Sequence, residues 1–86
     1  MAEIIENKKG FLVIKTSLTE IANIGGLGIC DECNKASFVG YLVCVLNHWM
    51  CQDCYDQWSK RAKYYPEDSA IEQRNYNRYM KVFNLA

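Results

Sequence analysis

The chain has 86 residues, an apolar content of 50% and no formal net charge, because ten lysines and arginines balance ten aspartates and glutamates. A chain this short buries only about 60–65% of its unfolded surface, so its core needs help from a metal ion, disulfides or a partner. The composition excludes a disordered chain, and zero net charge argues against a dominant attraction to nucleic acid or anionic membranes.

The five cysteines raise the question of a secreted disulfide scaffold. Their number is odd, four of them are grouped in pairs, and residues 1–9 are acidic and polar, without the apolar core of a signal peptide. No apolar run approaches the roughly 20 residues of a membrane span. We therefore expect a cytoplasmic protein whose cysteines bind metal in a reducing environment.

Residues 1–9 are predicted to be a flexible lead-in, because they are polar. The β-branched run Phe11–Thr16 is typical of a buried strand. Ser17 and Glu20 have the spacing of a capping box, which predicts a short helix over about residues 18–24 that ends at a glycine pair.

The apolar run Gly40–Leu46 predicts a second strand. Asn47 and His48 are predicted to form a two-residue hairpin turn, because Asn, and occasionally His, tolerates a positive φ. The two residues before Cys51 would then form a short return strand.

Two helices are predicted to follow. The first begins at or just after Cys51 and ends before Pro66, with an acidic residue in its first turn and basic residues in its last, as the helix dipole favours. The second runs to about Phe83, with Ser69 and Glu72 as a capping box. Its irregular apolar stripe contains Ile71, Tyr76, Tyr79, Met80, Val82 and Phe83. We expect the aromatic residues of this region to pack the second helix against the first.

The strongest chemical signal is a pair of Cys-x-x-Cys motifs. Two such pairs at this separation are typical of a zinc site, because four thiolates form the tetrahedral ligand set that zinc prefers. A two-residue spacer lets both sulfurs of a pair face one ion, and free amides at a helix start stabilise thiolate charge in the second pair. The predicted metal ligands are Cys30, Cys33, Cys51 and Cys54.

The order of knuckle, β-hairpin, second cysteine pair and helix resembles the treble-clef class of zinc fingers over about residues 30–64. The resemblance implies one structural Zn²⁺ at the four cysteines, but the class is functionally broad and transfers no activity. The expected fold is a small zinc-stabilised α+β domain over residues 1–86. It consists of a strand and short helix (10–27), the treble-clef-like finger (28–64) and a C-terminal helix (66–84).

Several alternatives stay open. Cys44 is expected to pack as a small apolar side chain and His48 to be exposed or to cap a turn, yet either could replace a cysteine ligand. The four sulfurs would also suit iron, and two cysteine pairs can occur in a small core by chance. A redox-active pair is disfavoured by the lack of a thioredoxin-like βαβ pattern, and a catalytic Cys44–His48 pair by the lack of a third residue to orient the base.

No enzymatic activity is expected, because zinc without an open coordination position cannot activate water. Abundant tyrosine and tryptophan favour a protein-binding module or regulator, with a homodimer as one form. The alternative is a nucleic-acid-binding regulator, since Arg74, Arg78 and Lys81 have the spacing of one helix face and tyrosines lie nearby. The simpler interpretation of that stripe is a solvated face, and neither a membrane nor a small-molecule substrate is expected.

Overall fold

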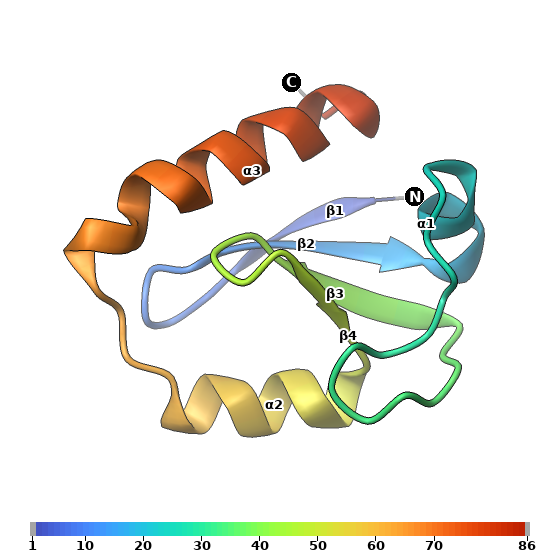
Figure 1. Ribbon diagram of the computed structural model, residues 1–86, viewed down its shortest axis with the longest axis horizontal. Coiled ribbons are helices and arrows are strands. Elements are labelled where there is room, and N and C mark those ends of the chain that lie inside the picture. Colours follow the sequence, from blue (N-terminus) through green and yellow to red (C-terminus); the bar gives the residue numbers. More distant parts are fainter. Residues whose placement is uncertain (1, 86) are drawn as a thin grey trace.

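The computed structural model describes residues 2–85, which form a four-stranded antiparallel sheet with helices on both faces (Figure 1). The strands follow one another across the sheet in chain order: β1 (Glu3–Glu6), β2 (Leu12–Ser17), β3 (Val39–Val43) and β4 (His48–Met50). The helical elements are α1 (Leu18–Asn23), α2 (Gln52–Arg61), the 3₁₀ turn η1 (Pro66–Asp68) and α3 (Ser69–Val82). The α+β class is as predicted.

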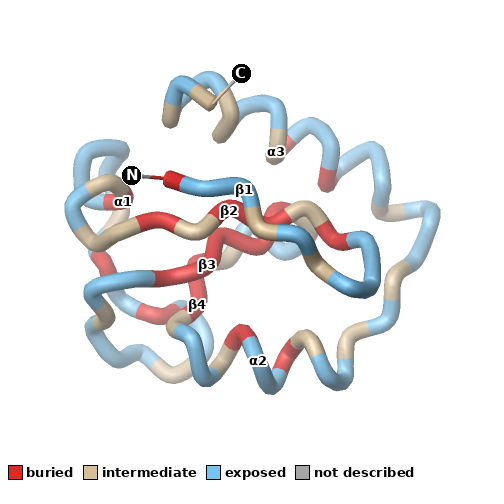
Figure 2. The backbone as a smooth tube through the Cα atoms, turned by 180° about the vertical axis from the view of Figure 1, so that it is seen from behind, coloured by how far each residue is buried: buried red, intermediate tan, exposed pale blue. Residues whose placement is uncertain are grey.

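Each face of the sheet has its own core, because successive side chains of a strand point to opposite faces. The face toward α2 buries Phe11, Val13, Cys30, Tyr41, Val43, Met50, Tyr55 and Trp58. The face toward α3 buries Ala2, Ile14, Ile21, Leu42, Cys44 and Trp49. Figure 2 shows these buried segments concentrated in the strands. A strand covered on both faces has no polar side, which explains the unbroken apolar run of residues 40–44.

The capping box predicted at the start of α1 is confirmed. The Ser17 hydroxyl accepts a hydrogen bond from the Glu20 N–H at 3.2 Å, and the Glu20 carboxylate accepts one from the Ser17 N–H at 2.9 Å. After this helix, Gly25 adopts a φ of 91°, which a residue with a side chain rarely adopts. The short helix therefore ends where the glycine pair predicts.

Two predictions about the strands are wrong. Within the supposed lead-in of residues 1–9, Glu3–Glu6 form β1, which pairs with β2 along its whole length. Main-chain pairing holds this edge strand, and its exposed residues leave no alternating apolar pattern to recognise. The β3–β4 turn also begins earlier than predicted: β3 ends at Val43, residues 44–47 form the turn, and His48 is already in β4. Asn47 does take the expected positive φ, at 56°.

α3 differs most from expectation, because it lies across the sheet from α2 and the two helices do not pack together (Figure 1). Its aromatic residues meet the sheet instead, while Ile71 and Val82 of the predicted stripe are half-exposed. The Ser69–Glu72 capping box does not form: Ser69 is the first helical residue, and the buried Glu72 carboxylate accepts the Leu12 N–H at 3.0 Å. None of the helices within residues 2–85 combines the length and apolar character needed to span a bilayer.

Candidate metal centre

The four predicted ligands converge at one end of the sheet. The Sγ atoms of Cys30, Cys33, Cys51 and Cys54 all lie within 4.8 Å of one another. The Cys33 and Cys51 sulfurs, from different pairs, are 3.8 Å apart. A tetrahedron with metal–sulfur bonds of about 2.3 Å has sulfur–sulfur edges of about 3.8 Å. The four-cysteine cluster therefore has the dimensions of a site that can hold one metal ion.

The first cysteine pair sits in a tight knuckle. Asn34 has a φ of 62°, and its N–H donates to the Cys30 carbonyl at 2.8 Å, which closes the turn. The Cys30 sulfur accepts the N–H groups of Glu32 and Cys33 at 3.4 and 3.5 Å. Backbone amides therefore point at the sulfur, where they stabilise thiolate charge.

The segment around the knuckle is a two-stranded ribbon, here called the knuckle ribbon (residues 27–38). Ile29 and Ala36 form an antiparallel bridge, the Ser37 N–H donates to the Gly28 carbonyl, and the Cys30 N–H donates to the Lys35 carbonyl. Gly28 has a φ of 70°, and a methyl group there would overlap the Leu18 side chain. Leu18 of α1 thus supports the inner face of the ribbon.

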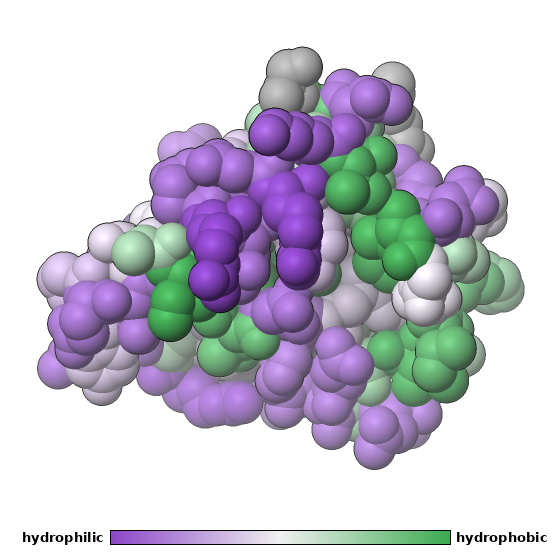
Figure 3. Space-filling model, turned by 45° about the horizontal axis from the view of Figure 1, so that its top comes forward, coloured by the Kyte–Doolittle hydropathy of each residue, from purple (hydrophilic) through white to green (hydrophobic). Residues whose placement is uncertain are grey.

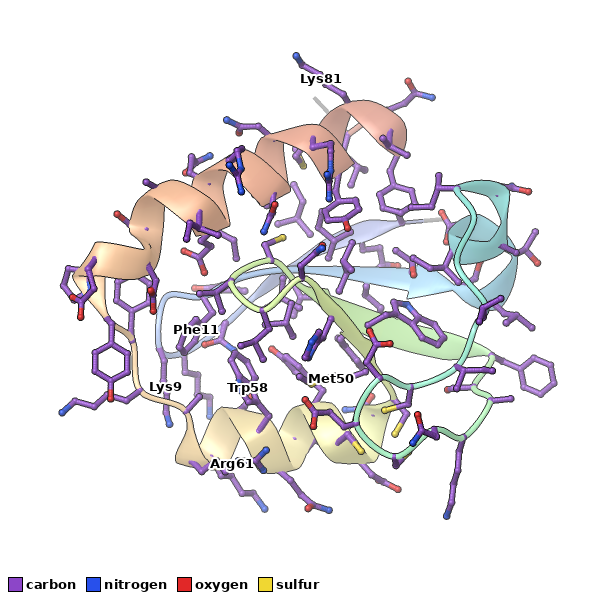
Figure 4. All side chains as sticks on the ribbon, in the orientation of Figure 1. Lys9, Phe11, Met50, Trp58, Arg61 and Lys81 are labelled. Atoms are coloured by element: carbon purple, nitrogen blue, oxygen red, sulfur yellow. The ribbon has the colours of Figure 1, made fainter. Side chains whose placement is uncertain are left out.

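The second cysteine pair belongs to the start of α2. Cys51 is the N-cap residue, and Cys54 follows in the first turn, so both side chains lie on the same side of the helix. The preceding residue, Met50, is fully buried between the sheet and α2, which fixes where the helix begins. Figure 4 shows a group of yellow sulfur atoms between this helix start and the knuckle.

Two hydrogen bonds hold the two cysteine pairs in position relative to each other. The Asp31 N–H donates to the Trp49 carbonyl at 2.9 Å, and the Trp49 N–H donates to an Asp31 carboxylate oxygen at 2.8 Å. The knuckle is thereby fastened to the edge of β4, two residues before Cys51. Both cysteine pairs therefore depend on the same strand.

Two of the four thiols have pKa values that are shifted in opposite directions. Burial works to raise the pKa of Cys30, but hydrogen bonds from the backbone of Cys33, Cys51 and Glu32 outweigh it and lower the pKa to about 6. The pKa of Cys54 is raised above its usual range, first by desolvation and then by its neighbouring sulfurs. A cation between the sulfurs would replace this mutual repulsion with attraction.

Cys44 and His48 lie outside the cluster. Cys44 is buried in the core on the α3 face, where burial, with a contribution from the charge of Glu72, raises the pKa of its thiol to about 12. His48 is 45% exposed, and its Nδ1 lies 3.4 Å from a Glu32 carboxylate oxygen. All five cysteines are free thiols. Cys44 therefore packs as an apolar residue, as predicted, and four sulfurs alone make up the candidate ligand set.

Two exposed side chains beside the cluster were not predicted from the sequence. Leu27 and Phe38, at the ends of the knuckle ribbon, are 83% and 84% exposed. The only sequence signal for Leu27 is its place between glycines, where neither a helix nor a strand can shelter an apolar side chain.

Comparison of the chain with protein families, curated proteins and solved structures finds no match.

Proposed function

We propose that the chain is a non-enzymatic binding module in which one structural zinc ion, held by the four-cysteine cluster, orders a surface for a protein partner. Four sulfur donors in tetrahedral array suit zinc or iron. The second pair at a helix start, in place of a second knuckle, favours zinc in a treble-clef-like arrangement. Free thiols suit a reducing compartment such as the cytoplasm.

The observation that carries the proposal is the exposure of Leu27 and Phe38 on the ribbon that also carries Cys30 and Cys33. Single exposed apolar residues are common, but a short ribbon that exposes two large apolar side chains by more than four-fifths offers apolar surface to a partner. Because the metal would fix the knuckle, it would also fix the backbone that carries these two side chains. The four sulfurs leave no open position for water, so the zinc has a structural role.

The metal is tested by removing ligands one at a time. Cys30→Ser or Cys54→Ser should unfold the knuckle and the start of α2, because zinc binding contributes on the order of 10 kcal/mol to folding in small fingers. Native mass spectrometry gives the stoichiometry, and circular dichroism with and without a chelator gives the folding. Cys44→Ala is the matched control and should retain one zinc. A native spectrum after complete metal removal would contradict a structural role.

The interaction surface is tested by affinity capture from native lysate. Three baits are compared: the intact chain, Cys51→Ser and Phe38→Ser. A partner of the metal-ordered surface should be retained by the first bait and lost from the other two. Equal capture by all three baits would argue against the proposal.

The second candidate, nucleic-acid binding, has one favourable observation. Arg74, Arg78 and Lys81 are exposed on the outer side of α3, and within residues 2–85 the only ion pair is the one between His48 and Glu32. Figure 3, with α3 turned toward the viewer, shows strongly hydrophilic side chains gathered there. Tyr76 and Tyr79 of α3 are partly buried against the sheet, and the Arg78 side chain already lies over the Tyr79 ring, which counts against stacking on bases.

The salt dependence of binding distinguishes nucleic-acid binding from binding of a protein partner. Retention on heparin or DNA that falls steeply as salt rises, and that Arg74→Ala with Arg78→Ala abolishes, would favour nucleic acid. Retention that is absent at low salt would exclude it.

A further inference from the structure

A hollow of about 310 Å³ lies between the core and the segment that leads from α1 to the knuckle. In Figure 1 this segment runs from α1 toward the start of α2. The inner boundary of the hollow is formed by Ile21 and Trp49, which are buried, and its outer wall by Leu27 and Ile29, which are exposed. Pockets for small molecules typically measure about 300–1,000 Å³, so a hollow of this size suits a single side chain of a partner better than a large cofactor.

The hollow is preformed, because hydrogen bonds hold its outer segment at both ends. At one end the Gly26 N–H donates to the Ile21 carbonyl at 2.8 Å. At the other end the Asp31 N–H donates to the Trp49 carbonyl, and the Trp49 N–H donates back to the Asp31 carboxylate. The two residues of the inner boundary therefore also fix the segment beside them. A site that needs no rearrangement costs less free energy to occupy.

Two exposed polar residues, Asp31 and Asn34, also line the hollow. One Asp31 carboxylate oxygen accepts the Trp49 N–H, and within residues 2–85 no hydrogen bond engages the other oxygen or the Asn34 side chain. A cationic group would therefore find a charged acceptor and a neutral one beside the apolar walls. Lysine and arginine side chains combine such a group with an apolar stem.

The charges of this part of the molecule favour the same kind of ligand. Between Lys15 and Lys60 the chain has one basic residue, Lys35, but five acidic ones: Glu20, Asp31, Glu32, Asp53 and Asp56. Four of the five belong to the knuckle and to the first half of α2, the two segments that meet at the four-cysteine cluster. Four thiolates around one zinc ion would leave two further negative charges uncompensated. A chain without net charge thus has an acidic end, which attracts cations.

We propose that this hollow binds a lysine or arginine side chain of the protein partner. The apolar stem lies against Leu27 and Ile29, and the cationic group meets the Asp31 carboxylate and the Asn34 side chain. The inference rests on the proposed function and gives the partner a chemistry: an exposed segment in which a basic residue has apolar neighbours. Those neighbours contact Leu27, which is 83% exposed.

A titration of the isotope-labelled, zinc-loaded full chain, followed by NMR, tests this. The probes are two capped pentapeptides with leucines on both sides of the central residue, which is lysine in one and norleucine in the other. Norleucine keeps the apolar stem and lacks the charge. The lysine peptide should bind about three to ten times more tightly, and its affinity should fall as salt rises. The amide signals of Leu27, Ile29 and Asn34 should shift, and those of α3 should not.

Asp31→Asn is the decisive variant, because its amide oxygen can still accept the Trp49 N–H while the charge is lost. It should lower the affinity for the lysine peptide to about that for the norleucine peptide. Asp53→Asn is the matched control, since Asp53 is equally near the cysteines in sequence but does not line the hollow. It should change the affinity by less than about twofold. Zinc content and circular dichroism establish that both variants are folded.

Four results would overturn the inference. They are equal affinity for the two peptides, unchanged affinity in Asp31→Asn, and no binding of the lysine peptide at about 10 mM, a concentration that detects millimolar affinity. The fourth is butylammonium binding as tightly as the lysine peptide, which would indicate a site for a small amine. The proposed function is judged separately, by zinc stoichiometry and by capture with the Phe38→Ser bait, because Phe38 does not line this hollow.

Discussion

At the scale of single residues, Trp49 links the two halves of the structure. Its indole Nε1–H donates to the Thr16 hydroxyl at 2.8 Å, and its backbone exchanges hydrogen bonds with Asp31 of the knuckle. Its ring lies directly over Gly40 of the neighbouring strand, where any side chain would occupy the space of the indole. One tryptophan therefore fastens the metal-bearing knuckle to the α3 face of the sheet.

Gly40→Ala should destabilise the fold, because the added methyl group overlaps the Trp49 ring and forces it out of its position. The expected loss is about 1–3 kcal/mol, the usual cost of overpacking a core. Urea unfolding of the metal-loaded protein measures it. In a Trp49→Phe background the same glycine substitution should cost less, since the smaller ring leaves room. Equal costs in both backgrounds would show that the two residues are not coupled.

At the scale of elements, α3 is held to the sheet by buried polar contacts as well as by apolar packing. Glu72 accepts the Leu12 N–H at the start of β2, and the Asn75 amide donates to the Cys44 carbonyl at 2.9 Å in the β3–β4 turn. Both side chains are buried. These two contacts fix how far along the sheet the helix lies, which apolar packing alone specifies less sharply.

Glu72→Ala and Asn75→Ala should each lower the free energy of unfolding by about 1–3 kcal/mol, because each leaves a buried backbone group without its partner. Glu72→Gln keeps an acceptor oxygen and should cost less than Glu72→Ala. Arg74→Ala, on the solvent side of α3, should change stability by no more than about 0.5 kcal/mol. If Arg74→Ala and Asn75→Ala prove equally costly, the helix is not fixed by these contacts.

The β1–β2 turn supports α2 in a similar way. The Lys9 Nζ donates to the carbonyls of Lys60 and Ala62 at 3.1 and 2.6 Å, at the C-terminus of the helix (Figure 4). Lys9→Ala should therefore increase amide hydrogen exchange in the last turn of α2 and destabilise the protein by about 0.3–1 kcal/mol. Lys8→Ala, one residue away, is the control. A similar increase in exchange with Lys8→Ala would indicate a general charge effect instead of this contact.

At the scale of the whole molecule, stability is expected to depend on pH through the metal centre. Hydrogen bonds hold the pKa of Cys30 at about 6, below its ordinary value of 9.0, so the folded chain favours this thiolate. A lowered pKa contributes stability that is complete above the unfolded value and is lost as the pH falls toward the folded value. The raised pKa of Cys54 acts the other way in the metal-free chain, because it favours the protonated thiol, whereas protons compete with a bound metal ion for all four thiolates as the pH falls.

The protein should therefore retain its metal at neutral pH and release it in acid, as protons compete with the metal for the four thiolates. A colorimetric zinc indicator, read beside circular dichroism during an acid titration, follows both events. Metal release and loss of structure should coincide. Release that leaves the spectrum native down to strongly acidic pH would mean that the ion does not hold the fold together.

Local chemistry in the sequence was enough to identify the four cysteines that gather at one point, the Ser17–Glu20 capping box and the start of α2 at Cys51. The capping box, the helix start and each Cys-x-x-Cys pair depend on residues within a few positions of each other, and the separation of the two pairs is itself typical of a zinc site. Only the tertiary structure decided that Glu3–Glu6 complete the sheet, that α3 covers the face opposite α2, and that Glu72 bonds Leu12 instead of capping its own helix. Each of these joins residues far apart in the chain, and the energy of such a contact depends on burial that no local pattern records.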